Sequence, residues 1–154
     1  MRTAWRLVKT RRIKDAFDGE GARLHGGRWN SPGKSAVYAS ETRALATLEV
    51  LAGLGGTSSL PDYSLIQLLF EDSLVEDVDM PALPPGWDAR PPGAASQVIG
   101  DAWLAATTSA VLRVPSVIVP GEHNYVLNPA HPDFRAIVVR PPVSFSIDPR
   151  LHHQ

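Results

Sequence analysis

The segment from residue 80 to residue 93, MPALPPGWDARPPG, restricts the fold of this 154-residue chain more than any other stretch does. Proline fixes φ and has no amide hydrogen, so neither a continuous helix nor a central strand can pass through it. Neither the segment before it nor the segment after it is long enough to be expected to form a stable domain by itself. We therefore interpret this segment as a surface loop within one domain that spans residues 1–154, and not as a linker.

Hydrophobic periodicity on both sides of this loop predicts a mixed α+β fold. Strands outnumber helices and do not alternate regularly with them, so a doubly wound parallel sheet is not expected. A basic loop or short helix is expected over residues 9–14. The predicted strands cover residues 3–8, 35–40, 63–70, 73–79, 115–120, 135–140 and 143–148, and the second predicted helix covers residues 95–112.

The first predicted helix follows the strand at residues 35–40 and has the sequence RALATLEVLAG. Ser40 is expected to cap its N-terminus, where Glu41 suits the positive end of the helix dipole. The apolar face is expected to run through Leu45, Leu48 and Ala52. Glycines at positions 53, 55 and 56 are expected to end it.

Composition excludes several classes of protein. The chain has no cysteine, so it has neither disulfides nor thiolate zinc sites. Its formal charge of −1 gives no overall attraction to nucleic acid or to anionic lipid. The histidines lack the i, i+4 spacing of a helical metal pair, so no metal site is expected. No signal peptide and no apolar run of membrane-spanning length are found, so we expect a cytoplasmic protein without membrane contact.

The stretch LHGGRWNSPGKSAVYAS, residues 24–40, combines groups that suit an anion site. Gly27 belongs to a glycine pair that lets the backbone pass close to a ligand, and Arg28 offers a planar fork of donors for phosphate or carboxylate. A glycine turn with a surface arginine is the alternative. Tyr38 ends the next strand, and Glu49 lies on the shoulder of the apolar helix face, where it either covers the core edge or faces a cleft.

These motifs resemble the signature of the RES domain, a family of bacterial toxins that are paired with antitoxins. The resemblance rests on GGRWNSPGKSAVYASETRALATLEVL, on WRL near the start, and on GDAWLAATTSAVLRVPSVIVPGEHNYVLNPAHPDF. It extends over nearly the whole chain. It implies a fold similar to the ADP-ribosyltransferases of the diphtheria-toxin kind, in which two small, mostly antiparallel sheets and flanking helices enclose an NAD cleft.

The resemblance also implies a function: the toxin of a RES–Xre type II system that depletes NAD by cleaving the nicotinamide–ribose bond, through hydrolysis or phosphorolysis. Two alternatives remain, a mono-ADP-ribosyltransferase acting on a protein such as phosphoribosyl pyrophosphate synthetase, and a binding module without turnover. NAD would be a substrate, since GEGARL at residues 19–24 lacks the third glycine of a dinucleotide-binding fingerprint. The expected partner is an antitoxin with an Xre-like helix-turn-helix domain, which would make any contact with DNA.

The matching family positions are Arg28, Tyr38, Glu49 and Ser116. Loss of nicotinamide leaves positive charge on the ribose, which the Glu49 carboxylate would stabilise while it orders the 2′-hydroxyl. Arg28 would bind the diphosphate, and Tyr38 would stack on nicotinamide. Ser116 is interpreted either as a turn residue or as a hydrogen-bond partner of a phosphate or ribose oxygen. Further candidate NAD-binding residues are Arg6, Gly27, Trp29, Asn124 and Asn128.

Overall fold

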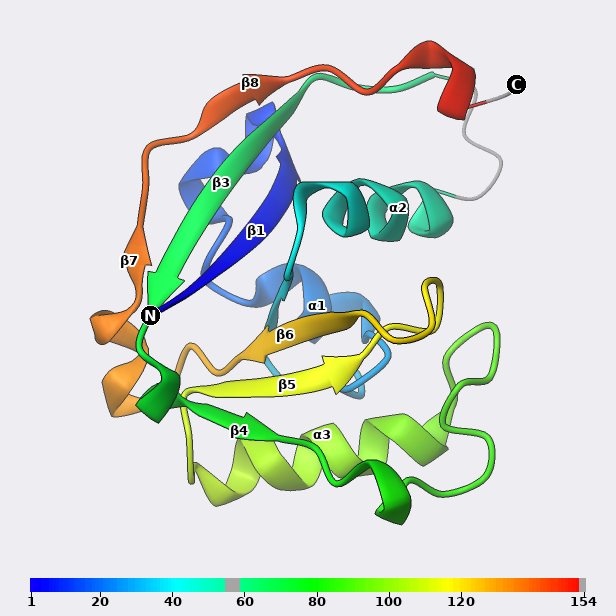
Figure 1. Cartoon of the computed structure of the whole chain (residues 1–154), viewed down its shortest axis with the longest axis vertical. Helices are drawn as coiled ribbons and strands as arrows, with labels where there is room; N and C mark the ends of the chain where they lie inside the picture. Colours follow the sequence, from blue (N-terminus) through cyan, green and yellow to red (C-terminus); the bar gives the residue numbers. More distant parts are fainter. Residues whose placement is uncertain (55–58, 153–154) are drawn as a thin grey trace.

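A computed structural model describes residues 1–54 and 59–152. In these ranges the fold is α+β, as predicted, and three α-helices accompany eight strands (Figure 1). The helices are α1 (Glu20–His25), α2 (Arg43–Gly53) and α3 (Ala94–Ala106). The strands are β1 (Arg2–Lys9), β2 (Val37–Ser40), β3 (Tyr63–Phe70), β4 (Val75–Asp77), β5 (Val111–Pro115), β6 (His123–Leu127), β7 (Val138–Val139) and β8 (Val143–Phe145). Short 3-10 helices cover Thr10–Asp15, Asp72–Leu74, Met80–Ala82, Pro132–Ala136 and Pro149–Leu151.

The strands form one hydrogen-bonded sheet in the order β4-β5-β6-β2-β1-β3-β7, and β8 also pairs with β3. The expectation of two separate sheets is therefore corrected. All pairings are antiparallel except that of β4 with β5. All of β1 pairs with β3, but β1 and β2 share only the pair Trp5–Ser40. The sheet is held there by a narrow junction, and β1 and β3 cross the view at a steep angle to β5 and β6 (Figure 1).

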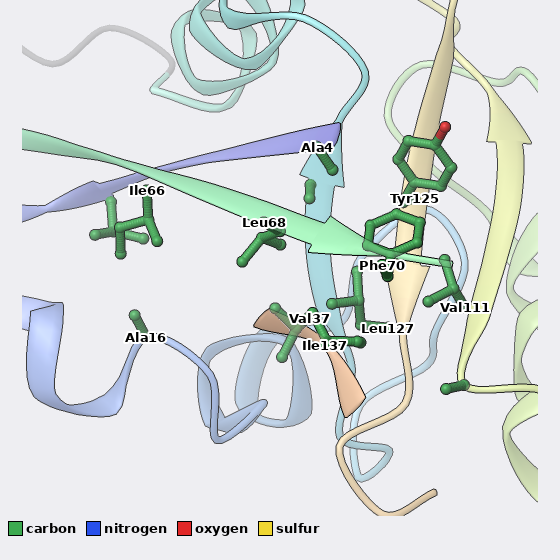
Figure 2. Close-up of a cluster of buried hydrophobic side chains, with 13 residues drawn as sticks. Ala4, Ala16, Val37, Ile66, Leu68, Phe70, Val111, Tyr125, Leu127 and Ile137 are labelled. Carbon is green, nitrogen blue, oxygen red and sulfur yellow. The ribbon is translucent and has the colours of Figure 1, made fainter. Parts of the chain in front are cut away.

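A buried apolar cluster joins the two parts of the sheet (Figure 2). Ala4, Ile66, Leu68 and Phe70 come from β1 and β3, and they meet side chains from the other half of the sheet, among them Val37, Tyr125 and Leu127. Phe70 and Tyr125 contact edge to face, with ring centroids 5.3 Å apart. A second cluster packs under α3 around Trp29 and Trp103, and a third packs α2 against β1 and β3. The core therefore fixes the relative position of the two halves.

Several predicted boundaries are wrong. The helix predicted over residues 95–112 ends at Ala106, because Thr107 adopts a left-handed conformation and residues 111–115 form β5. Residues 116–120 are not a strand, whereas β6 and α1 were not predicted. These differences arise where short segments with mixed polarity gain their conformation from pairing and packing.

The start of α2 also differs from the prediction. Its cap is Thr42, whose Oγ1 accepts a hydrogen bond from the Leu45 amide at 3.0 Å, and not Ser40. The buried face comprises Leu45, Ala46 and Thr47, whereas Leu48 is 37% exposed. Gly53 is the last helical residue, as expected. The predicted stops at glycines 55 and 56 lie outside the described residues.

Candidate active site

A cavity of about 880 Å³ lies beside the narrow junction between β1 and β2. This volume is in the upper part of the range for small-molecule sites. Its walls come from β1, α1, the loop after α1, β2, α2, β6 and the proline-rich loop. Seven of the predicted site residues line it, namely Arg6, Gly27, Arg28, Trp29, Tyr38, Glu49 and Asn124.

The Glu49 carboxylate is held by residues from two other parts of the chain. Its Oε2 accepts hydrogen bonds from Ser116 Oγ at 3.0 Å and from Asn124 Nδ2 at 2.6 Å. Oε1 has no hydrogen-bond partner among residues 1–54 and 59–152. Of the two interpretations of the shoulder position, the structure therefore supports the one in which Glu49 faces a cleft. One carboxylate oxygen is therefore fixed by two hydrogen bonds, and the other is not.

Ser40 completes this network, and the sequence analysis did not assign it to the site. Ser40 lies opposite Asn124 in the β2–β6 register, and its hydroxyl donates to Asn124 Oδ1 at 2.7 Å. The amide of Asn124 is thereby oriented with its NH₂ group toward Glu49. The only signal in the sequence was a serine at the end of a predicted strand, which also suits a helix cap.

Ser116 is both a turn residue and a partner of the carboxylate. It is 4% exposed, and its Oγ accepts the amides of Ile118 and Val119, each at 3.1 Å. The hydroxyl hydrogen is donated to Glu49, and Ser116 does not line the cavity. In this structure the Ser116 hydroxyl contacts Glu49, and its expected contact with a phosphate or ribose oxygen stays a prediction.

Asn128 is also placed elsewhere. Its side chain is buried, donates to the Leu104 carbonyl at 3.3 Å and accepts the Ala130 amide at 3.0 Å. It does not line the cavity. This amide joins the end of α3 to the turn after β6, and the expected contact of Asn128 with NAD stays a prediction.

Arg28 is held by the proline-rich loop. Its Nη1 donates to the carbonyls of Trp87, at 3.0 Å, and Ala89, at 2.9 Å. Partial burial lowers the pKa of Arg28, and the negative charge of Glu49 acts in the opposite direction. The guanidinium and the carboxylate, far apart along the chain, thus lie within electrostatic range on the walls of one cavity.

Arg6 is a second cation of the cavity. It projects from β1 into the gap beside β2, where Nη1 donates to the Tyr38 carbonyl at 2.7 Å and Nε donates to the Ala16 carbonyl at 2.8 Å. No carboxylate forms an ion pair with it in the described part of the chain, and Asp18 acts only at longer range. Burial lowers the pKa of Arg6 to about 10. A buried cation that is hydrogen-bonded to carbonyls but has no ion-pair partner among the described residues favours an anionic ligand.

Tyr38 joins β2 to the loop that carries Arg28. Its hydroxyl donates to Asn30 Oδ1 at 2.6 Å and accepts the Trp29 amide at 3.0 Å. Burial raises the pKa of this phenol, so it stays protonated. Tyr38 lines the cavity, whereas its hydroxyl is engaged in hydrogen bonds with the loop that carries Arg28. A Cβ at Gly27 would lie 2.7 Å from the Tyr38 oxygen, which explains the glycine there.

Trp29 forms part of the cavity wall and of the core. Its side chain is 2% exposed and stacks on Trp87 of the proline-rich loop, with ring centroids 6.1 Å apart and planes inclined by 29°. This contact holds the loop against the site. The loop also contributes Arg90, Pro91 and Pro92 to the cavity walls.

Across the described ranges, no group of three or more histidine, aspartate or glutamate side chains is arranged to hold a metal ion. None of the described helices combines the length and the apolar character that crossing a bilayer requires.

Comparisons with known proteins agree with the resemblance to the RES domain that the sequence motifs indicate. Residues 3–148 match the RES domain family. The chain is 36% identical to "Toxin Res" of Photorhabdus laumondii over 96% of its length and 95% of that protein's. It is 39% identical to "Prs ADP-ribosylating toxin" of a Sphingobium species over 96% and 94% of the two chains.

A solved structure resembles the fold. A chain of the M. tuberculosis MbcT–MbcA toxin–antitoxin complex superposes with a TM-score of 0.75 and 23% identity, covering 94% of this chain and 84% of that one. At this identity the likeness concerns the fold alone. The match over residues 3–148 and the identity with the two relatives lead to one conclusion: the chain belongs to the RES domain family.

Proposed function

We propose that this protein is the toxin of a toxin–antitoxin pair and that it acts on NAD by breaking the bond between nicotinamide and ribose. The observation that carries the proposal is the Glu49 carboxylate: Oε2 is held by Ser116 and Asn124, and Oε1 has no partner within the described part of the chain. Glu49 lies on the wall of a cavity that Arg6 and Arg28 also line. Names of relatives, "Toxin Res" among them, support the proposal.

The chemistry needs an anion beside the sugar. When the C1′–N bond breaks, its electron pair leaves with nicotinamide and positive charge develops on the ribose. A carboxylate that is already oriented stabilises this charge without reorganising, and its free oxygen can accept the 2′-hydroxyl hydrogen bond. An acceptor then forms the new bond to C1′. With water as acceptor, the products are nicotinamide, ADP-ribose and a proton.

The two arginines suit the diphosphate of NAD. A guanidinium binds phosphate oxygens through charge-assisted hydrogen bonds, and it stays charged at neutral pH even when burial lowers its pKa. Arg6 and Arg28 lie on the β1 side and the loop side of the cavity. Ligand binding between them would offset the desolvation of both groups, whereas Glu49 remains for the sugar.

The test is nicotinamide release by the purified protein, with Glu49→Gln as the key variant. Gln is nearly isosteric, and its carbonyl oxygen can still accept the bonds from Ser116 and Asn124. We expect ADP-ribose binding and the melting temperature to be retained, and the release rate to fall by a factor of about a hundred or more. Leu48→Ala, a change at the exposed neighbouring position, is the control. A Glu49→Gln rate within threefold of wild type contradicts the proposal.

A second activity, mono-ADP-ribosylation of a protein, has one specific point in its favour. One relative carries the name "Prs ADP-ribosylating toxin". Incubation with NAD labelled on the adenylate distinguishes the acceptors, because transfer labels a protein band, whereas hydrolysis and phosphorolysis give labelled small molecules. Binding of NAD without nicotinamide release would instead indicate a binding module.

We further propose an antitoxin partner, since the structural neighbour comes from a toxin–antitoxin complex. An antitoxin with an Xre-like helix-turn-helix domain would supply DNA binding, which the near-zero charge of this chain does not favour. Co-expression with a candidate antitoxin that carries an Xre-like domain tests this proposal. Co-purification and loss of nicotinamide release are expected, and release at the full rate in the complex would contradict inhibition.

A further inference from the structure

Arg28 is held at both ends by one continuous part of the chain, residues 87–101, which comprises the end of the proline-rich loop and the first turns of α3. We propose that this segment is a positioning element for Arg28, with Gln97 and Gly100 as its positioning residues. The proposal rests on the binding of a nucleotide diphosphate by Arg28 that is proposed above.

At the backbone end, side chains of α3 bind the loop that carries Arg28. Ser96 Oγ donates to the Arg28 carbonyl at 2.5 Å, and Gln97 Nε2 donates to the Gly27 carbonyl at 3.0 Å. Ser96 is fully buried. The two carbonyls that flank the Arg28 backbone are therefore both satisfied by side chains of one helical turn.

Gly100, one turn later, lets the loop approach the helix. A Cβ at this position would lie 1.6 Å from the Trp29 carbonyl oxygen. Glycine inside a helix costs about 1 kcal/mol relative to alanine, and this close approach explains why glycine occupies position 100 despite that cost. Asp101 adds two bonds, accepting the Ser31 amide at 3.0 Å and the Ser31 hydroxyl at 2.5 Å. Positions 96, 97, 100 and 101 share one helix face.

At the side-chain end, the loop that leads into α3 holds the guanidinium. The carbonyls of Trp87 and Ala89 use Nη1, so Nε and Nη2 hold the donors that remain for a ligand. Arg90 ties this loop to the other side of the cavity by donating to the Val117 carbonyl at 3.1 Å. A guanidinium that is ordered before binding loses less side-chain entropy when a ligand arrives.

The helix itself does not touch the cavity. Among the described residues, those that line the cavity include none from α3. An effect of Gln97 on ligand binding must therefore pass through the loop that carries Arg28. This separates a positioning role from a direct contact, and it makes a double-mutant cycle informative.

The experiment measures ADP-ribose binding by calorimetry for Gln97→Met, Arg28→Ala and the double variant. Removing the amide donor is expected to weaken binding about five- to tenfold in the wild-type background. In the Arg28→Ala background the same change is expected to weaken binding less than twofold. Val98→Ala, at a 64% exposed position of the same helix, is the matched control and is expected to bind like wild type.

Equal factors in the two backgrounds, or no effect of Gln97→Met in wild type, would overturn the proposal. Gly100→Ala is expected to weaken binding more than Gln97→Met does, and the Gln97 cycle decides the question if that variant does not fold. A readout without ligand keeps the test separate from the proposed function: the Nε–Hε order parameter of Arg28 is expected to fall in Gln97→Met. An unchanged order parameter would overturn the positioning role, whereas absent ADP-ribose binding by wild type would overturn the function alone.

Discussion

The substitution Arg6→Met is expected to leave stability nearly unchanged while it removes much of the affinity for a diphosphate. Burial lowers the pKa of Arg6 from 12.5 to about 10. At 1.36 kcal/mol per pKa unit, this corresponds to a desolvation cost of about 3 kcal/mol for the charged form. Methionine has a similar length and no charge, so the substitution removes this cost.

Two lost hydrogen bonds oppose this gain in folding free energy. The carbonyls of Ala16 and Tyr38 lose their donors, at about 1–3 kcal/mol each, with the lower value expected beside a water-accessible cavity. The free energy of unfolding is therefore expected to stay within about 2 kcal/mol of wild type. The unfolded chain binds more protons between pH 10 and 12.5, so the desolvation cost is fully present below pH 10 and is relieved as pH rises through that value.

The loss of ligand-binding free energy in Arg6→Met has no such compensating gain. Hydrogen bonds to a charged group contribute about 1.5–3 kcal/mol, which corresponds to a loss of about 10- to 150-fold in ADP-ribose affinity. Urea denaturation and calorimetry at pH 7.5 measure the two quantities, and Arg11→Met, at an exposed position of the adjacent 3-10 helix, serves as the control. Affinity within twofold of wild type, or a stability loss well above 3 kcal/mol, would refute the reasoning.

Three further predictions concern Asn124, Tyr38 and the start of α2. Asn124→Asp replaces the amide donor 2.6 Å from Glu49 Oε2 with a carboxylate. Two carboxylates this close do not both stay ionised, so the acid limb of the pH–rate profile is expected to move up by about two pH units. Profiles of variant and wild type that superimpose would contradict this. Burial raises the pKa of Tyr38, so its phenol is expected to stay un-ionised at about pH 11, and the wild-type titration followed at 295 nm is expected to match that of Tyr38→Phe up to this pH. Because the unfolded chain releases this proton first, stability falls as pH rises above about 10; a wild-type titration that exceeds that of Tyr38→Phe by one phenolate would argue against it. Thr42→Ala removes the α2 cap and is expected to cost about 1 kcal/mol and to lower Tm by about 2–4 °C with kcat unchanged; a fall in kcat would show that the helix start also positions Glu49.

The parts that the sequence predicted correctly have strong local patterns. The strand at residues 63–70 agrees with β3 at both ends, because its apolar run is buried almost throughout and is bounded by polar residues. The helix over RALATLEVLAG is also confirmed and ends at Gly53 as expected, although its cap is Thr42 and not Ser40. The loop at residues 80–93 contains no strand and only a short 3-10 turn, as its prolines require.

The sequence by itself also predicted that Arg28 and Glu49 face one hollow, because the motifs that carry them resemble one family, and both residues line the same cavity. Only the tertiary structure decided how the site is held. Ser40 lies beside Asn124 through strand register, Ser116 reaches Glu49 across 67 residues, and Gly100 permits a contact that no local pattern records. Hydrophobic periodicity reflects burial within one element, whereas these partners are set by the pairing and packing of elements distant in sequence, and their hydrogen bonds exist only after the core has formed.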